Sequence, residues 1–156
     1  MKKIVSVLVA CLLMLTASPA LAHVSVQTKG SLLNAGSGSR IWMSLGHGCT
    51  YKDQKYGTQV FSVDVPKSAG KPTPEFHYGF KTSVVASKSV DAKGVPDYYT
   101  VTWTAKSKNF AIDDGTFYDF GLKVTFDAVA QKIFLPTTQI CYAPLADRTK
   151  KPLYLK

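Results

Sequence analysis

Apolar and polar residues alternate in short runs along most of the chain. The clearest run is Phe120, Leu122, Val124 and Phe126, in which every second residue is apolar. Four further runs repeat this period: Ile41 to Leu45, Phe61 to Val65, Tyr78 to Val84 and Tyr99 to Trp103. A period of two predicts β-strands that bury one face and expose the other.

The segments between these runs are rich in Gly, Pro, Ser and Asp. They are residues 34–39, 66–74, 91–97 and 113–116. Within the last one, Asp113-Asp114-Gly115 is typical of a turn. No helical stripe of any length is present, and Pro152 to Leu155 is predicted as a final edge strand. About seven or eight strands at this spacing predict an all-β fold, an antiparallel β-sandwich.

The first 22 residues have the pattern of a secretory signal. Lys2 and Lys3 precede an apolar run from Ile4 to Leu15, and Ala20-Leu21-Ala22 has the small-x-small form of a cleavage site. We therefore expect a signal peptide at 1–22 and one domain at 23–156. No second run approaches the roughly 20 apolar residues of a membrane span, so the mature protein is expected in the periplasm or outside the cell.

Two other uses of the N-terminal segment are disfavoured. An uncleaved anchor would need a longer apolar run than this one. Lipidation at Cys11 is a further alternative, but apolar residues rather than a polar tether follow that cysteine. The cleaved signal therefore remains the prediction.

The net charge is positive, but the basic residues are not clustered in the way that nucleic-acid binding needs. The formal charge of +9 becomes +7 when Lys2 and Lys3 leave with the signal. The remaining lysines are scattered, and only Arg40 and Arg148 carry the planar guanidinium that binds phosphate in a bidentate way. We expect a solvated, lysine-rich surface and no nucleic-acid partner.

Removal of the signal leaves two cysteines, Cys49 and Cys141. In an oxidising compartment, two cysteines most simply form one disulfide. The alternative is a pair of thiolate metal ligands. We predict the disulfide from the compartment.

Three histidines are candidate metal ligands. Cleavage after Ala22 makes His23 the first residue, so that one residue carries both a free α-amine and an imidazole. Such a pair of nitrogens suits Cu(II), which favours tetragonal geometry. His47, in His-Gly-Cys, follows an apolar row and is expected at the rim of the core, as a ligand or as a structural side chain. His77 is expected to begin a strand as a surface histidine.

Other site chemistry receives less support from the sequence. Neither a Gly-x-Ser-x-Gly nor a His-Glu-x-x-His motif is present, and Glu75 is the sole glutamate. Asp119 is either a ligand or a surface charge, and the second reading is preferred. Trp103 lies on an apolar strand face, where its default role is core packing.

A set of short segments, taken in order and spacing, matches the pattern of a known family. They are His23–Val26, Gly46–Cys49, Val63–Pro66, Pro74–Phe80, Val101–Trp103, Gly115–Phe120 and Gln139–Cys141. Together they resemble the YcnI-like copper-binding domain family of exported bacterial proteins. The resemblance implies an immunoglobulin-like or cupredoxin-like β-sandwich.

The resemblance also implies a copper site. In it, His23 holds Cu(II) through amine and imidazole, and Trp103 borders the site. Members with a glutamate after the second strand use it as a ligand, but this chain has His47-Gly48 there, so His47 is predicted as a third nitrogen ligand. Asp119 stands where other members carry glutamate and is one methylene shorter.

We therefore expect a copper-binding protein without enzymatic activity. It would deliver copper to a cuproenzyme or copper-transport protein, or sequester it. One alternative is a copper oxidase or monooxygenase that uses the same site. Another is an immunoglobulin-like interaction module that binds no metal.

Overall fold

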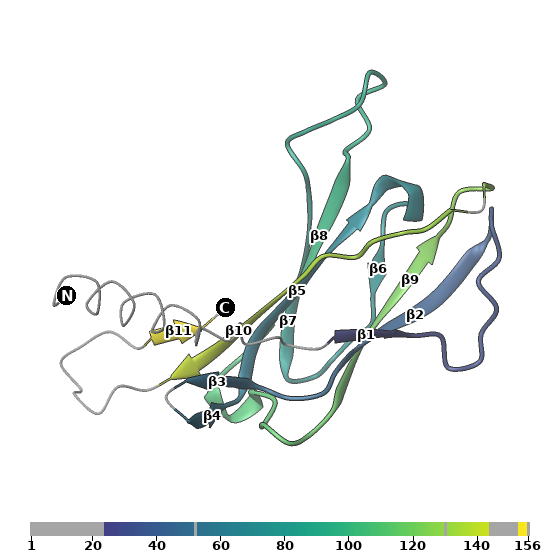
Figure 1. The fold of residues 1–156 in the computed structure, drawn as a ribbon. Coiled ribbons are helices and arrows are strands. Elements are labelled where there is room, and N and C mark those ends of the chain that lie inside the picture. Colours follow the sequence, from purple (N-terminus) through teal and green to yellow (C-terminus); the bar gives the residue numbers. More distant parts are fainter. Residues whose placement is uncertain (1–23, 52, 130, 144–152, 156) are drawn as a thin grey trace, which may run out of the picture.

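The computed structural model describes residues 24–51, 53–129, 131–143 and 153–155. Two antiparallel sheets pack face to face, with a small hairpin at one end (Figure 1). The predicted antiparallel β-sandwich is therefore confirmed. Within the described ranges, no helix is both long enough and apolar enough to cross a membrane.

Each sheet is built from strands that are distant in sequence. The first sheet has the order β1 (Val24–Gln27), β2 (Gly38–Leu45), β9 (Tyr118–Thr125) and β6 (Thr73–Pro74). The second has the order β11 (Leu153–Leu155), β10 (Thr137–Ala143), β5 (Thr58–Pro66), β8 (Tyr98–Ala105) and β7 (Phe80–Ala86). The hairpin joins β3 (Cys49–Tyr51) and β4 (Gln54–Tyr56), and two 3-10 turns span Lys67–Ala69 and Lys108–Phe110. β11 confirms the predicted C-terminal edge strand.

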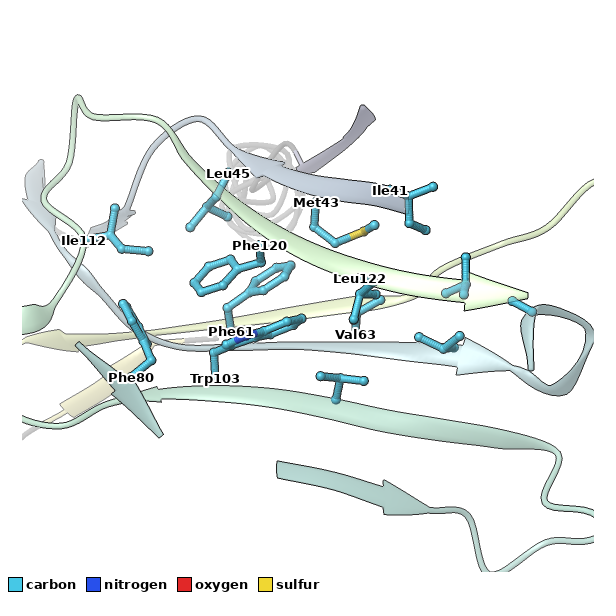
Figure 2. Packing of buried hydrophobic residues seen from close by; sticks show 14 residues of the cluster. Ile41, Met43, Leu45, Phe61, Val63, Phe80, Trp103, Ile112, Phe120 and Leu122 are labelled. Atoms are coloured by element: carbon cyan, nitrogen blue, oxygen red, sulfur yellow. The ribbon is translucent and has the colours of Figure 1, made fainter. Parts of the chain in front are cut away.

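The apolar rows of four strands meet between the sheets. Ile41, Met43 and Leu45 of β2 are at most 1% exposed. Phe61 of β5, Trp103 of β8 and Phe120 of β9 are fully buried and pack ring against ring (Figure 2). The ring centroids of Phe61 and Phe120 are 4.9 Å apart, and those of Trp103 and Phe120 are 4.8 Å apart. The alternation of apolar and polar residues therefore predicted correctly which faces of these strands point into the core.

One predicted row is confirmed only in part. The run from Tyr78 to Val84 was expected to face the core, but β7 begins only at Phe80, and Tyr78 is 74% exposed in the turn before it. Phe80 is the one buried residue of β7. β7 is an edge strand of the second sheet, in which Val84 is half-buried against the core and Thr82 is exposed.

The disulfide joins the small hairpin to the second sheet. Cys49 begins β3 and Cys141 lies in β10, with their Cα atoms 5.9 Å apart. The predicted pairing is confirmed, and these sulfurs are not available as thiolate ligands. The predicted turn at residues 113–115 is also present, with Gly115 at a φ of 87°.

Candidate metal centre

The starts of β1 and β9 and the end of β2 meet at one end of the first sheet. Val24, the first described residue, is the Cα partner of Leu45, which in turn is the partner of Tyr118. β2 ends at Leu45, and His47 follows two residues later. The beginning of β1 and the His47 loop therefore lie at the same edge of the fold.

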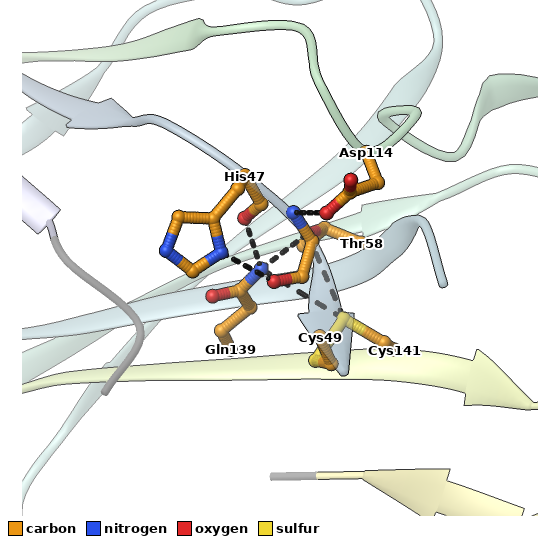
Figure 3. Close-up of a disulfide and its surroundings, with 7 residues drawn as sticks. His47, Cys49, Thr58, Asp114, Gln139 and Cys141 are labelled. Carbon is orange, nitrogen blue, oxygen red and sulfur yellow. Dashed lines mark hydrogen bonds between the residues drawn. A yellow bond between two sulfur atoms is a disulfide. The ribbon is translucent and has the colours of Figure 1, made fainter. Parts of the chain in front are cut away.

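The His47 ring is held by its own backbone neighbour. Its Nδ1 lies 2.7 Å from the carbonyl oxygen of Gly48. Because a carbonyl only accepts hydrogen bonds, Nδ1 is the donor in this contact. In Figure 3, this ring points toward the side where β1, in pale purple, enters the view. A backbone carbonyl on one ring nitrogen is the usual way to orient a metal-binding histidine.

Side chains from distant strands fix the backbone around His47. The amide of Gln139, in β10, donates to the His47 carbonyl oxygen at 2.8 Å and to Thr58 Oγ1 at 2.6 Å. The Gly48 N–H donates to Asp114 Oδ1 at 3.0 Å. These contacts, together with the disulfide one residue later, hold the loop on both sides (Figure 3).

Gly48 is required by close packing. A Cβ at this position would overlap the carbonyl oxygen of Tyr56 in the neighbouring strand. Any larger residue therefore has to push the His47 loop away from the hairpin. The glycine of His-Gly-Cys thus allows the loop to pass close beside β4.

Asp114 is an ionised anchor for this loop. Its carboxylate pairs with Lys55 at 3.0 Å. The hydrogen bond from Lys55 lowers the pKa of the Asp114 carboxyl, and the Gly48 N–H acts in the same direction. From the sequence, Asp114 was predicted only as part of a turn, because nothing in its local pattern indicates a contact with a loop 66 residues away.

Asp119 lies on the outer face of the first sheet. It is the cross-strand partner of Ser44, and its Oδ2 pairs with Lys29 at 2.9 Å. Burial raises the pKa of the Asp119 carboxyl, but hydrogen bonds from Lys29 and Ser44 outweigh it and leave the pKa lowered. Its Oδ1 is buried without a hydrogen-bond partner among the described residues. The carboxylate is thus already charged and engaged by a lysine.

Trp103 packs in the core between the sheets. It is 0% exposed, and its ring lies against Phe61 and Phe120. The indole N–H has no hydrogen-bond partner among the described residues. Core packing is therefore its observed role, and a role beside copper stays a prediction.

His77 is not the surface residue that the sequence indicated. It lies in the loop before β7, half-buried, with Nδ1 2.8 Å from the Tyr118 hydroxyl and its ring 5.4 Å from that of Phe120. Burial lowers the pKa of the His77 imidazole, and the charge of Glu75 opposes this only in part. Its Nε2 is buried and has no partner within the described ranges.

The structure brings no complete ligand set together. His23 lies outside the described residues, and the described residues contain no group of three or more His, Cys, Asp or Glu side chains able to hold a metal ion. In this part of the chain, His47 is the imidazole at the junction of β1 and β2.

Comparisons with known proteins establish the fold alone. The sequence matches no protein-family model and no curated protein. Among solved structures, the chain is similar to an uncharacterized protein from Nocardia farcinica described as having an immunoglobulin-like fold. The two share 18% identity with a TM-score of 0.57, over 85% of this chain and 82% of the other. The fold is therefore an immunoglobulin-like β-sandwich.

Proposed function

We propose that this protein is exported and binds Cu(II) at the edge where β1 begins. The ligands are the α-amine and imidazole of His23 after cleavage of residues 1–22, with the imidazole of His47 as the third nitrogen. Copper is its cargo, which it delivers to a cuproenzyme or copper-transport protein or holds in reserve. The proposal includes membership of the YcnI-like family, which rests on the order of sequence segments.

The observation that carries the proposal is the pairing of Val24 with Leu45. Consecutive Cα atoms are about 3.8 Å apart, and each residue advances a strand by about 3.3 Å. His23 is one residue from Val24, and His47 is two residues from Leu45. The proposal therefore rests on two short covalent links, from His23 to Val24 and from Leu45 to His47, whose inner ends are cross-strand partners.

The chemistry of the donors supports copper in particular. An α-amine titrates near ~8 and an imidazole near ~6.5, so both are available at neutral pH. Nitrogen donors in a tetragonal arrangement favour Cu(II) over other divalent ions of the first row. Because Cu(II) competes with protons for these groups, copper affinity is expected to fall as the pH drops through that range.

The first test is a titration of the exported protein with Cu(II), followed by EPR. Intact mass first confirms that the chain begins at His23. We expect a one-to-one tetragonal signal with nitrogen hyperfine structure, which His23→Ala abolishes. An added residue before His23 is expected to have the same effect, because it moves the terminal amine away. Equal affinity in the extended form would contradict the chelate.

The role of His47 is tested separately. We expect His47→Ala to weaken copper binding at least about tenfold, since even loss of an outer-shell partner has that effect on metal sites. His77→Ala is the matched control, because that ring lies against Tyr118 and Phe120 and its loss is expected to leave the hyperfine pattern unchanged. Unchanged affinity in His47→Ala would remove His47 from the site.

The same sample distinguishes binding from catalysis. A carrier is expected to produce little peroxide from oxygen and ascorbate, whereas a copper oxidase or monooxygenase would turn over repeatedly. If the chain begins at His23 and shows no tight copper binding, the metal-free interaction module replaces the proposal.

A further inference from the structure

A second possible site lies on the outer face of the first sheet, apart from the His47 loop. A groove of about 310 Å³ runs across β2, β9 and β6 on this face. Its lining combines an aromatic ring, two cations and one carboxylate. The residues that matter are Arg40, Trp42, Thr73, Glu75, Gly121 and Lys123.

The register of β2 and β9 places the groove on one side of Trp42. Three cross-strand pairs follow one another on this face: Ser44 with Asp119, Trp42 with Gly121, and Arg40 with Lys123. Lys29 Nζ lies 4.6 Å from the centroid of the Trp42 ring and pairs with Asp119. Lys29 therefore covers the side of the ring toward Asp119, and the groove lies on the side toward Arg40.

The absence of a side chain at Gly121 makes room for the Trp42 ring. The Trp42 indole N–H donates to Glu75 Oε2 at 3.0 Å, directly above this glycine. A Cβ at residue 121 would overlap that carboxylate oxygen and come within 2.9 Å of the indole nitrogen. The absence of a side chain at Gly121 thus lets Trp42 and Glu75 meet and fixes the angle of the ring.

Two unpaired cations face each other beside the ring. Arg40 and Lys123 are direct cross-strand partners and both are exposed. Neither forms an ion pair with any residue that the structure describes. Like charges placed opposite each other destabilise a sheet, so the pair is better explained by an anion that lies between them. The Arg40 guanidinium offers the planar fork that matches a carboxylate.

We propose that this groove binds a carboxylated sugar, such as one residue of a uronic acid chain. The apolar C–H face of the sugar ring lies on Trp42, and the carboxylate lies between Arg40 and Lys123. Glu75 uses one oxygen for the indole, so its other oxygen and the Thr73 hydroxyl accept from sugar hydroxyls. A few polar groups around an apolar wall are typical of small-molecule sites, and an open groove admits a chain as well as a single residue.

The protein's two tryptophans make the test direct. Trp103 is fully buried in the core and Trp42 lies at the groove, so a ligand changes the emission of Trp42 and leaves Trp103 as an internal reference. Metal-free protein in EDTA is titrated with trigalacturonate, galacturonate, neutral maltotriose and inorganic sulfate at constant ionic strength. We expect a saturable change with trigalacturonate and none with maltotriose or sulfate. A response to trigalacturonate alone assigns the groove to a chain, and an equal response to galacturonate assigns it to one residue.

Substitutions distinguish binding in this groove from the non-specific attraction of anions to a basic protein. Arg40→Gln and Lys123→Gln are each expected to weaken trigalacturonate binding at least about tenfold, because charge-assisted hydrogen bonds are lost. Lys81→Gln removes the same charge from an exposed position of β7 and is expected to leave trigalacturonate binding unchanged. Equal weakening in Lys81→Gln, an equal response to sulfate, or no saturable response would overturn the proposal. None of these results depends on copper.

Discussion

His47 and His77 both lie next to the end of a strand, yet their rings meet different surroundings. His47 follows β2 and contacts the backbone of its own loop, beside the disulfide. His77 precedes β7 and lies against the aromatic rings of Tyr118 and Phe120. One histidine is bordered by polar groups at the rim, and the other closes one end of an aromatic core.

The difference determines what each ring can do. Burial lowers the pKa of His77, so this ring stays neutral and serves packing. The Gly48 carbonyl accepts from Nδ1 of His47, so metal binding by this ring would use Nε2. Two side chains of the same type thus receive different chemistry, His47 from the backbone of its own loop and His77 from rings distant in sequence.

The largest expected effect follows from removing the disulfide beside His47. Cys49 and Cys141 are 92 residues apart, and chain-entropy arguments assign a crosslink of that length about 4–5 kcal/mol of unfolding free energy. The Cys49→Ala/Cys141→Ala double variant is expected to lose that amount in urea unfolding. Its His47 resonances are expected to shift more than those of His77. A loss below about 1 kcal/mol would mean that the rim is held by other contacts.

A smaller effect is expected from the amide that holds the His47 carbonyl. Gln139→Leu leaves that carbonyl and the Thr58 hydroxyl without their partner, which typically costs about 1–3 kcal/mol. We also expect weaker copper binding, because the His47 loop is no longer fixed. Gln54→Leu, at an exposed position of β4, is the matched control and is expected to change both quantities little. Equal effects in the two variants would show that Gln139 has no special role.

The fold was predictable because each inner strand buries one face only. The rows at Ile41, Phe61, Trp103 and Phe120 alternate for this reason. The same rule holds only in part at β7, an edge strand in which Phe80 is buried, Thr82 is exposed and Val84 is half-buried. The alternation of apolar and polar residues therefore predicts well where strands occur. It predicts poorly how deeply each strand is buried in the sandwich.

The candidate site was predictable only in part. The cysteine pair was predicted from the residue count and from the expected export of the chain, and the structure confirms the pairing. The contacts of His47 with Gln139 and of Gly48 with Asp114 span 92 and 66 residues, so only the packed sheets bring them together. The role of His23 as a ligand stays a prediction, and so does the binding of copper.

The smallest expected effect is a pH dependence that His77 contributes. Its folded pKa is lower than the unfolded value near ~6.5, so the unfolded chain binds the extra proton first. The contribution of His77 to stability is therefore complete above that value and decreases as the pH falls from it toward the lower folded pKa. Protonation would place a charge beside Tyr118 and Phe120, where the buried Nε2 has no partner among the described residues.

Urea unfolding of metal-free protein between about pH 7 and pH 5 measures this contribution, in the range around the reference pKa of histidine. His77→Phe keeps a ring of similar size and is expected to flatten the dependence, although Tyr118 loses its 2.8 Å contact and the variant starts from a lower stability. His47→Ala is expected to retain the slope that His77 supplies. If the slope survives in His77→Phe and disappears in His47→Ala, then His47 rather than His77 produces it. The acid sensitivity of the fold would then come from the rim and not from the aromatic end of the core.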